Sequence, residues 1–169
     1  MLKRLPNGTQ LLIRRIRPDD KPLLQQALSN LSELSVQRRF LGPKPRFSQA
    51  ELRYLTEVDD RNHVALVAES PSGPSRQLIG VARFVRDPEN PESAEVAIVV
   101  ADYWHGRGVG STLARELASR ARVLGIRCFT ASMASDNRPA RRLFEKLTDG
   151  LEQRPGPHGV SELSLAIAA

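Results

Sequence analysis

The sequence predicts a mixed α/β domain in which helices flank a central, mostly antiparallel sheet. Segments with helical and with strand periodicity alternate along the chain in mixed order, and the strand-like segments are short and apolar. The chain has 169 residues, of which 40% are hydrophobic, so it can bury one sizeable core. Two domains would each be too small, and we therefore expect residues 1–169 to form a single domain.

The first half of the chain predicts a strand, three helices and two further strands. Ser48, followed three residues later by Glu51, forms a capping box that opens the third helix. A hairpin loop is expected at residues 71–75, between the last two of these strands. The expected strands are Gln10–Arg15, His63–Glu69 and Gln77–Val85, and the expected helices are Asp19–Leu31, Glu33–Leu41 and Gln49–Glu57.

The second half predicts three strands and two helices. An apolar stripe spaced at helical period runs through Gly110–Leu124, and Pro139 stands in the first turn of the following helix. The expected strands are Ser93–Val100, Cys128–Met133 and Leu163–Ile167, and the expected helices are Gly110–Leu124 and Arg138–Leu147.

A glycine-rich turn, His105-Gly106-Arg107-Gly108-Val109-Gly110-Ser111, stands between the strand Ser93–Val100 and the helix after it. Glycines let the main chain turn tightly and approach a ligand, so N–H groups can converge on an anion at a helix start. Arg107 adds a side-chain donor. The turn predicts a site for the pyrophosphate of a nucleotide-like cofactor, although helix-entry turns also carry glycine without binding a ligand.

Two familiar phosphate-binding motifs do not fit this turn. A P-loop requires Gly-Lys-Ser/Thr, and no lysine lies between Lys44 and Lys146. A dinucleotide fingerprint requires Gly-x-Gly-x-x-Gly, whereas the glycines here are Gly106-x-Gly108-x-Gly110. Neither NTP hydrolysis nor NAD binding is supported.

The turn resembles the cofactor motif of the GNAT superfamily of acyl-CoA-dependent N-acyltransferases, Gln/Arg-x-x-Gly-x-Gly/Ala, with His105 at its first position. The segment Ala134–Lys146 resembles the family's later motif, an asparagine opening a helix that ends near Leu-Tyr-Glu-Lys. The run Arg38-Arg39-Phe40-Leu41-Gly42 is similar to the acetyltransferase domains of bacterial protein-lysine acetyltransferases. The resemblance implies a GNAT-like fold and acetyl-CoA as acyl donor.

The resemblance also implies which residues contact acetyl-CoA. The strand Ser93–Val100 would offer main-chain groups to the pantetheine amides, the glycine turn would bind the pyrophosphate, and Asn137 would contact the pantetheine arm. Phe144 stands where many members carry a tyrosine that protonates the departing thiolate, so it can pack against the arm but has no proton to give. The expected cofactor-binding residues are Ile98, Val99, Val100, His105, Gly106, Arg107, Gly108, Val109, Gly110, Ser111, Asn137, Arg138 and Phe144.

Glu95 is the predicted general base, because an amine near neutral pH is mostly ammonium and must lose a proton before it attacks a thioester. It is a carboxylate within an otherwise apolar strand, where burial would raise its pKa. In the resembling acetyltransferases a glutamate at the corresponding Ala-Glu-Val/Ile position acts as base, often through water. The alternative is that Glu95 simply points to solvent.

The other reactive residue types predict structural roles. We expect His63 and His158 to be surface or structural residues, His105 to be a donor in the turn, and Cys128 to be a buried strand residue. With one cysteine and no histidine pair at ligand spacing, no metal site is expected. Thr148-Asp149 replaces the Gly-Phe that commonly follows the family's last helix.

The net charge of +6 suits an anionic ligand such as CoA, and equally a nucleic acid or an acidic protein. A nucleic-acid binder is disfavoured because the chain lacks interleaved aromatic residues and any nucleic-acid motif. Neither a signal peptide nor a membrane span is expected, which predicts a cytoplasmic protein. We expect it to be a monomer or a homodimer. The expected acceptor is a protein lysine, with a small amine, an N-terminal amine or a non-catalytic acyl-CoA-binding module as alternatives. The segments Pro43–Ser48 and Leu151–Gly159 are expected to be acceptor loops.

Overall fold

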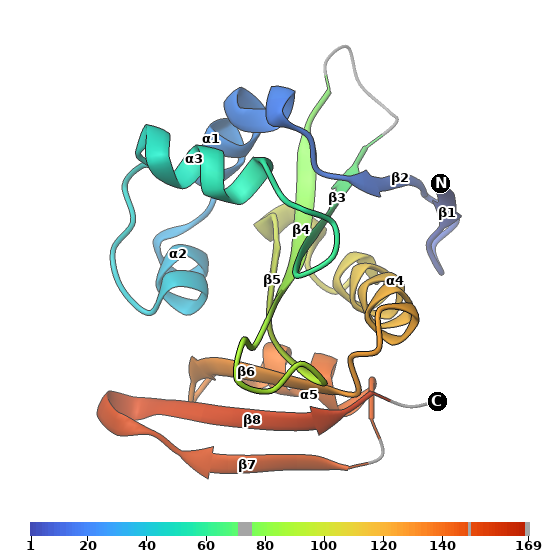
Figure 1. Cartoon of the computed structure of the whole chain (residues 1–169). Helices are drawn as coiled ribbons and strands as arrows, with labels where there is room; N and C mark the ends of the chain where they lie inside the picture. The colour runs from blue at the N-terminus through green and yellow to red at the C-terminus, as the bar shows by residue number, and fades with distance from the viewer. Residues whose placement is uncertain (71–75, 149, 168–169) are drawn as a thin grey trace.

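The computed structural model describes residues 1–70, 76–148 and 150–167. Its centre is one eight-stranded sheet with the order β1-β2-β3-β4-β5-β6-β8-β7. Each neighbouring pair is antiparallel except β5 and β6, which run parallel. The predicted mostly antiparallel mixed sheet with flanking helices is therefore confirmed (Figure 1).

Three short 3-10 helices, η1 (Pro18–Asp20), η2 (Asp102–Trp104) and η3 (Pro157–Gly159), accompany the regular elements. The strands are β1 (Leu2–Arg4), β2 (Gln10–Arg15), β3 (His63–Glu69), β4 (Leu78–Arg86), β5 (Ser93–Val100), β6 (Cys128–Ala134), β7 (Leu151–Pro155) and β8 (Val160–Ala166). The α-helices are α1 (Lys21–Ser29), α2 (Glu33–Phe40), α3 (Gln49–Thr56), α4 (Val109–Val123) and α5 (Arg138–Glu145).

The strand register separates two cores on the two faces of the sheet. On one face, Phe84 and Val96 are opposite each other and belong to the core that also holds Leu113 and Leu117 of α4. On the other face, Val81 packs with leucines of α1 and α3. Successive side chains of a strand point to opposite faces, so the apolar runs of β3 and β4 are explained by burial on both sides.

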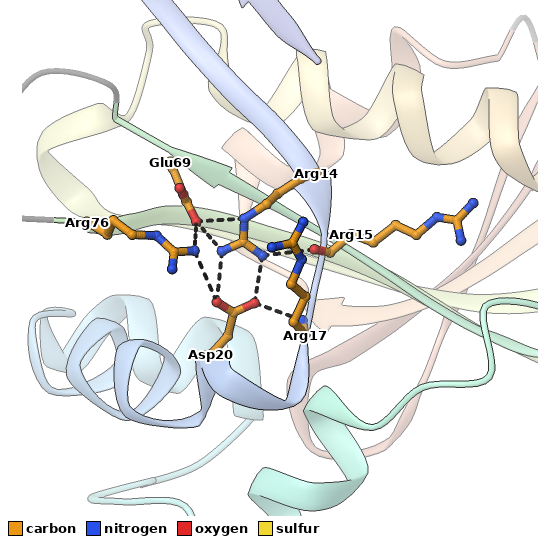
Figure 2. A network of polar contacts seen from close by, with 6 residues as sticks. All are labelled: Arg14, Arg15, Arg17, Asp20, Glu69 and Arg76. Atoms are coloured by element: carbon orange, nitrogen blue, oxygen red, sulfur yellow. Dashed lines mark hydrogen bonds and ion pairs between the residues drawn. The ribbon is translucent and has the colours of Figure 1, made fainter.

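Ion pairs fasten β2, β3 and the entry to α1 to one another (Figure 2). Arg14 Nε donates to Glu69 Oε1 at 2.8 Å, and its NH1 donates to Asp20 Oδ2 at 2.7 Å. The main-chain N–H of Arg17 also donates to Asp20 Oδ2, at 2.8 Å, and Arg76 NH2 donates to Glu69 at 2.8 Å. Burial alone would raise the pKa of Asp20, but these hydrogen bonds and charges outweigh it and lower that pKa.

Three features of the sheet differ from the sequence-based expectations. β1 was not predicted, and the last strand begins at Val160 instead of Leu163. The acceptor loop expected at Leu151–Gly159 is wrong, because that segment forms strand β7 and the 3-10 helix η3. The first helix starts at Lys21, after a 3-10 turn, and the hairpin loop expected at residues 71–75 lies outside the described residues.

Candidate active site

The sheet opens between its two parallel strands, β5 and β6. They pair only at Ser93↔Cys128, Ala94↔Phe129 and Glu95↔Thr130. Beyond Glu95 the strands separate, and Figure 1 shows β6, β8 and β7 lying apart from the end of β5. Among the described strands, β5 pairs only with β4 from Val96 to Val100, so its other main-chain edge is open over about 17 Å.

Glu95 is the last residue of β5 to pair with β6, so it lies where the two strands part. Its side chain is exposed. The burial expected from its apolar neighbours is therefore wrong, because Ala94 and Val96 point to the opposite face of the sheet. An exposed carboxylate at this point can accept a proton from a group that enters the opening, directly or through water.

The glycine turn lies at the far end of the open edge, between β5 and α4. Gly106 and Gly108 have φ values of +72° and +91°, which favour glycine, and Gly108 is the N-cap of α4. A Cβ on Gly106 would meet no heavy atom within 4 Å, so the main chain there is open to a ligand. The first N–H groups of a helix have no partner within the helix, so this turn fits an anionic group such as a diphosphate.

The side chains of this turn do not all behave as expected. His105 Nε2 lies 2.7 Å from the main-chain oxygen of Val100, and since that oxygen can only accept, the ring donates to it. His105 thus donates to the end of β5, and its expected contribution to cofactor binding stays a prediction. The guanidinium carbon of Arg107 lies 4.2 Å from the centroid of the Tyr103 ring, and the Arg107 side chain is half-buried beside the turn.

Helix α5 reaches the start of α4, at the end of the open edge. A Cβ on Gly110 would lie 3.5 Å from Val100 Cγ2 and 3.6 Å from Leu143 Cδ2. Asn137 caps α5 by accepting a hydrogen bond from Ala140 N at 3.2 Å, so its side-chain oxygen is already bonded. The remaining expected cofactor-binding residues lie as follows: Ile98, Val99, Val109 and Ser111 on β5 and the first turn of α4, Arg138 exposed on α5, and Phe144 buried in the α4-side core.

Arg83, which was not predicted as a site residue, is buried in the centre of β4. Arg83 NH1 lies 3.2 Å from His63 Nε2, and because a guanidinium only donates, the imidazole is the acceptor and is neutral. Burial, and then the charge of Arg83, lower the pKa of His63 from 6.5 to about 4. An arginine between apolar residues of a predicted strand, Val81-Ala82-Arg83-Phe84-Val85, was the signal that could have revealed it.

Helix α2 lies beside the opening and is tied to the end of β5. Asp102, just after β5, accepts hydrogen bonds from Ser32 N at 3.0 Å, Ser32 Oγ at 2.7 Å and Ser35 Oγ at 2.7 Å. The last turn of α2 carries Arg39, whose guanidinium is subject to the charge of Glu95. Among the described residues, Arg39 of α2, Arg83 of β4 and Glu95 of β5 therefore lie near one another. They share the face of the sheet that α1 and α3 cover.

Other features lie away from Glu95. A cavity of about 300 Å³ between α1 and η2 is lined by residues such as Gln26, Asn30 and Trp104, and Glu95 is not among them. Cys128 is half-buried instead of buried, and its Sγ lies 3.2 Å from Ser164 Oγ. His158 is exposed, as expected.

Within the described residues, no group of three or more His, Cys, Asp or Glu side chains is placed to hold a metal ion, and no helix is long and apolar enough to span a bilayer.

Comparison with known proteins agrees with this geometry. The family model of the acetyltransferase (GNAT) domain matches residues 10–148. The chain is 34% identical to acetyltransferase Pat of Mycolicibacterium smegmatis over 83% of its own length, and 30% identical to acetyltransferase PA5475 of Pseudomonas aeruginosa over 82%. It spans 41% of the length of the first of these relatives and 74% of the second.

Among solved structures, the GNAT domain of S. lividans PAT superposes with a TM-score of 0.87 and 28% identity. That match covers 99% of this chain and 96% of the other. The open edge of β5, the glycine turn before α4 and the extent of the family match lead to one conclusion. The chain belongs to the GNAT family of acetyltransferases, which use acetyl-CoA as acyl donor.

Proposed function

We propose that this chain transfers an acetyl group directly to an amine nitrogen, that Glu95 is the general base, and that the acceptor is a lysine side chain of a protein. The observation that carries the proposal is the position of Glu95 at the head of the open edge of β5, with the glycine turn at the other end. A ligand extended along that edge, with its diphosphate at the turn, would have its far end beside Glu95.

Acetyl-CoA supplies the acetyl group as a thioester. Main-chain groups of β5 from Val96 to Val100 would bind its amides as an added strand does, and Arg107 with the first N–H groups of α4 would hold its diphosphate. The side-chain oxygen of Asn137 caps α5, and its amide N–H₂, which donates to no described residue, would be directed toward the arm. Glu95 takes the proton of the attacking amine as the C–N bond forms, and main-chain N–H at the end of the edge would stabilise the developing negative charge. The C–S bond then breaks, and CoA leaves as the thiolate.

The lysine acceptor is supported by the similarity of the run Arg38-Arg39-Phe40-Leu41-Gly42 to bacterial protein-lysine acetyltransferases. The exposure of Glu95 also supports it, because a base near the surface can be reached by a side chain of a folded protein. A small amine or a protein N-terminal amine is the competing acceptor class, and the amine panel below distinguishes them.

The test compares Glu95→Gln with wild type at saturating acetyl-CoA. Loss of a general base predicts a fall in kcat of roughly 100- to 10,000-fold, with little change in acetyl-CoA affinity. Glu89→Gln, an exposed carboxylate in the turn before β5, is the matched control and should leave both unchanged. An unaltered kcat in Glu95→Gln would remove Glu95 from the mechanism.

The acceptor is tested with three amines at equal concentration: an N-terminally blocked peptide with one lysine, a peptide with a free N-terminus and no lysine, and a small polyamine. Acetylation of the lysine peptide above the other two supports the proposal. Preference for either of the others would replace the acceptor class. Absence of turnover on every amine by wild type, with acetyl-CoA still bound, would favour a non-catalytic acyl-CoA-binding module.

A further inference from the structure

Arg83 holds a buried positive charge on the acceptor side of the opening. In the register of the sheet it lies between two small residues, Ala65 of β3 and Ala97 of β5. Glu95 lies on the same face of the sheet, the one that α1 and α3 cover. It stands two residues before Ala97 on β5 and is therefore the diagonal neighbour of Arg83. The face that carries the predicted base therefore also carries a guanidinium.

The counter-charge of Arg83 is missing. Its residue exposure is 6%, and its NH1 donates to Leu55 O at 3.3 Å and to the neutral ring of His63. No carboxylate of the described residues lies within ion-pair distance of it. Arg14 in the same protein is also mostly buried, but it is held by both Asp20 and Glu69 (Figure 2). A buried guanidinium without an anion is costly, which suggests that the anion comes from a ligand.

Arg39 adds a second positive charge from the last turn of α2. It is half-buried, and its guanidinium carbon lies 4.9 Å from the centroid of the Phe40 ring, but no described residue gives it a hydrogen bond or an ion pair. Burial, and then the charge of Arg39, lower the pKa of Arg83 from 12.5 to about 10, so the two guanidinium groups are near enough to repel each other. Both remain charged at neutral pH. The charge of Glu95 acts on Arg39 in the opposite sense, which places all three groups in one neighbourhood.

We infer that Arg39 and Arg83 form a carboxylate-binding subsite for the acceptor, so that the enzyme prefers amines that carry a carboxylate near the nitrogen to be acetylated. This inference rests on the proposed transfer to an amine at Glu95. The two guanidinium charges and the Glu95 carboxylate leave one positive charge, which a single carboxylate neutralises. A bidentate guanidinium–carboxylate contact would also fix the orientation of the acceptor.

The carboxylate can come from two sources, namely an acidic residue next to the lysine of a protein or the α-carboxylate of a free amino acid. The first arm of the test uses blocked peptides with one lysine flanked by glutamate or, in the matched peptide, by glutamine. The second arm uses free lysine and lysinamide. Wild type should show a kcat/KM about 10- to 100-fold higher for the carboxylate member of at least one pair, and the preferred pair identifies the source.

Arg39→Gln should reduce that preference to near unity by raising KM for the acidic acceptor, with little effect on the neutral one. Arg83→Gln should do the same if it folds, which its thermal unfolding midpoint will show. Arg39 lies on a surface helix, so its variant keeps the test decisive if Arg83→Gln unfolds. Arg53→Gln, an exposed arginine on the neighbouring α3, is the matched control and should retain the full preference.

A binding measurement separates this inference from the proposed transfer. Peptides with norleucine in place of lysine cannot be acetylated, and the glutamate-flanked one should raise the thermal midpoint of wild type more than the glutamine-flanked one. Equal turnover of the paired acceptors, or a preference that survives in Arg39→Gln, would overturn the subsite while leaving acetyl transfer intact. Selective binding of the acidic norleucine peptide without turnover on any amine would instead overturn the transfer and keep the subsite.

Discussion

The ring of His105 donates from Nε2 to the main-chain oxygen of Val100 at 2.7 Å. This bond joins the first residue of the glycine turn to the last residue of β5, so it sets where the turn begins relative to the open edge. The oxygen of Val100 is consequently shared between the ring and any ligand that extends along β5, and a carbonyl oxygen has two lone pairs to share.

His105→Ala should weaken acetyl-CoA binding by about 2- to 10-fold, because one hydrogen bond that positions the turn is lost. Isothermal titration with acetyl-CoA measures this. His105→Gln, which restores the residue type usual in the family, should recover most of the affinity. His158→Ala, at an exposed histidine of η3, is the control. An affinity that His105→Ala leaves unchanged would show that the bond does not position the turn.

Gly108→Ala should reduce both stability and acetyl-CoA affinity. At a φ of +91° an alanine is strained by about 1–2 kcal/mol, and its Cβ would lie 3.2 Å from Pro6 Cδ. Gly125→Ala has a similar φ of +80° but open space around its Cβ and lies at the other end of α4. It should lose comparable stability in denaturant unfolding and keep its acetyl-CoA affinity. Equal affinities in the two variants would contradict a role for the turn in binding.

Arg14→Met should lower the free energy of unfolding by about 3 kcal/mol, since it leaves two carboxylates, Asp20 at 1% and Glu69 at 5% exposure, with Arg76 as their remaining ion-pair partner. Arg15→Met is the matched control, because Arg15 pairs with Asp60 at 3.1 Å near the surface. Such a pair is worth at most about 1 kcal/mol. Urea unfolding of both variants provides the measurement, and similar losses in the two would show that the buried network adds nothing beyond a surface pair.

Stability should fall as the pH decreases from 6.5 toward about 4, through the protonation of His63. The folded-state pKa is the lower one, about 4 against 6.5, so in this window the unfolded chain takes up a proton that the folded protein does not. For a half-buried ring the loss is on the order of 1–2 kcal/mol after solvent screening. Urea unfolding of wild type and His63→Gln across this range isolates the effect. Parallel pH profiles for the two proteins would contradict it.

Much of the fold was predictable because each central element carries its own signal. The apolar stripe of α4 and the capping box of Ser48 and Glu51 give the positions of those helices. The central strands are mostly apolar, which identifies β3, β4 and β5 from sequence. These signals are local, and the structure confirms them.

The edge strands were not predictable in the same way. The polar residues Glu152, Gln153 and Arg154 resemble a loop, yet they form β7 at the edge of the sheet, next to β8. An edge strand exposed on both faces does not need alternating apolar residues, and charges there discourage pairing with other molecules. Its existence depends on β8 as partner, which a local pattern does not reveal.

The candidate site was likewise predictable only where the signal is local in the sequence. The glycine turn could be predicted from the sequence, because its conformation requires glycine at positions 106 and 108. The exposure of Glu95 was not, since it depends on which segments, distant in sequence, cover that face of β5. The proximity of Arg39 to Arg83 likewise depends on how α2 packs beside the sheet.

The bonds from Asp102 to Ser32 and Ser35 have a kinetic consequence. They fasten the start of α2 to the residues that lead into the glycine turn, so we expect a shift of the turn to be passed on to the helix that bears Arg39. Binding of acetyl-CoA at the turn would then order the acceptor side of the site before the amine binds. Such a linkage favours a sequential order of addition, with acetyl-CoA first, over random entry of the two substrates.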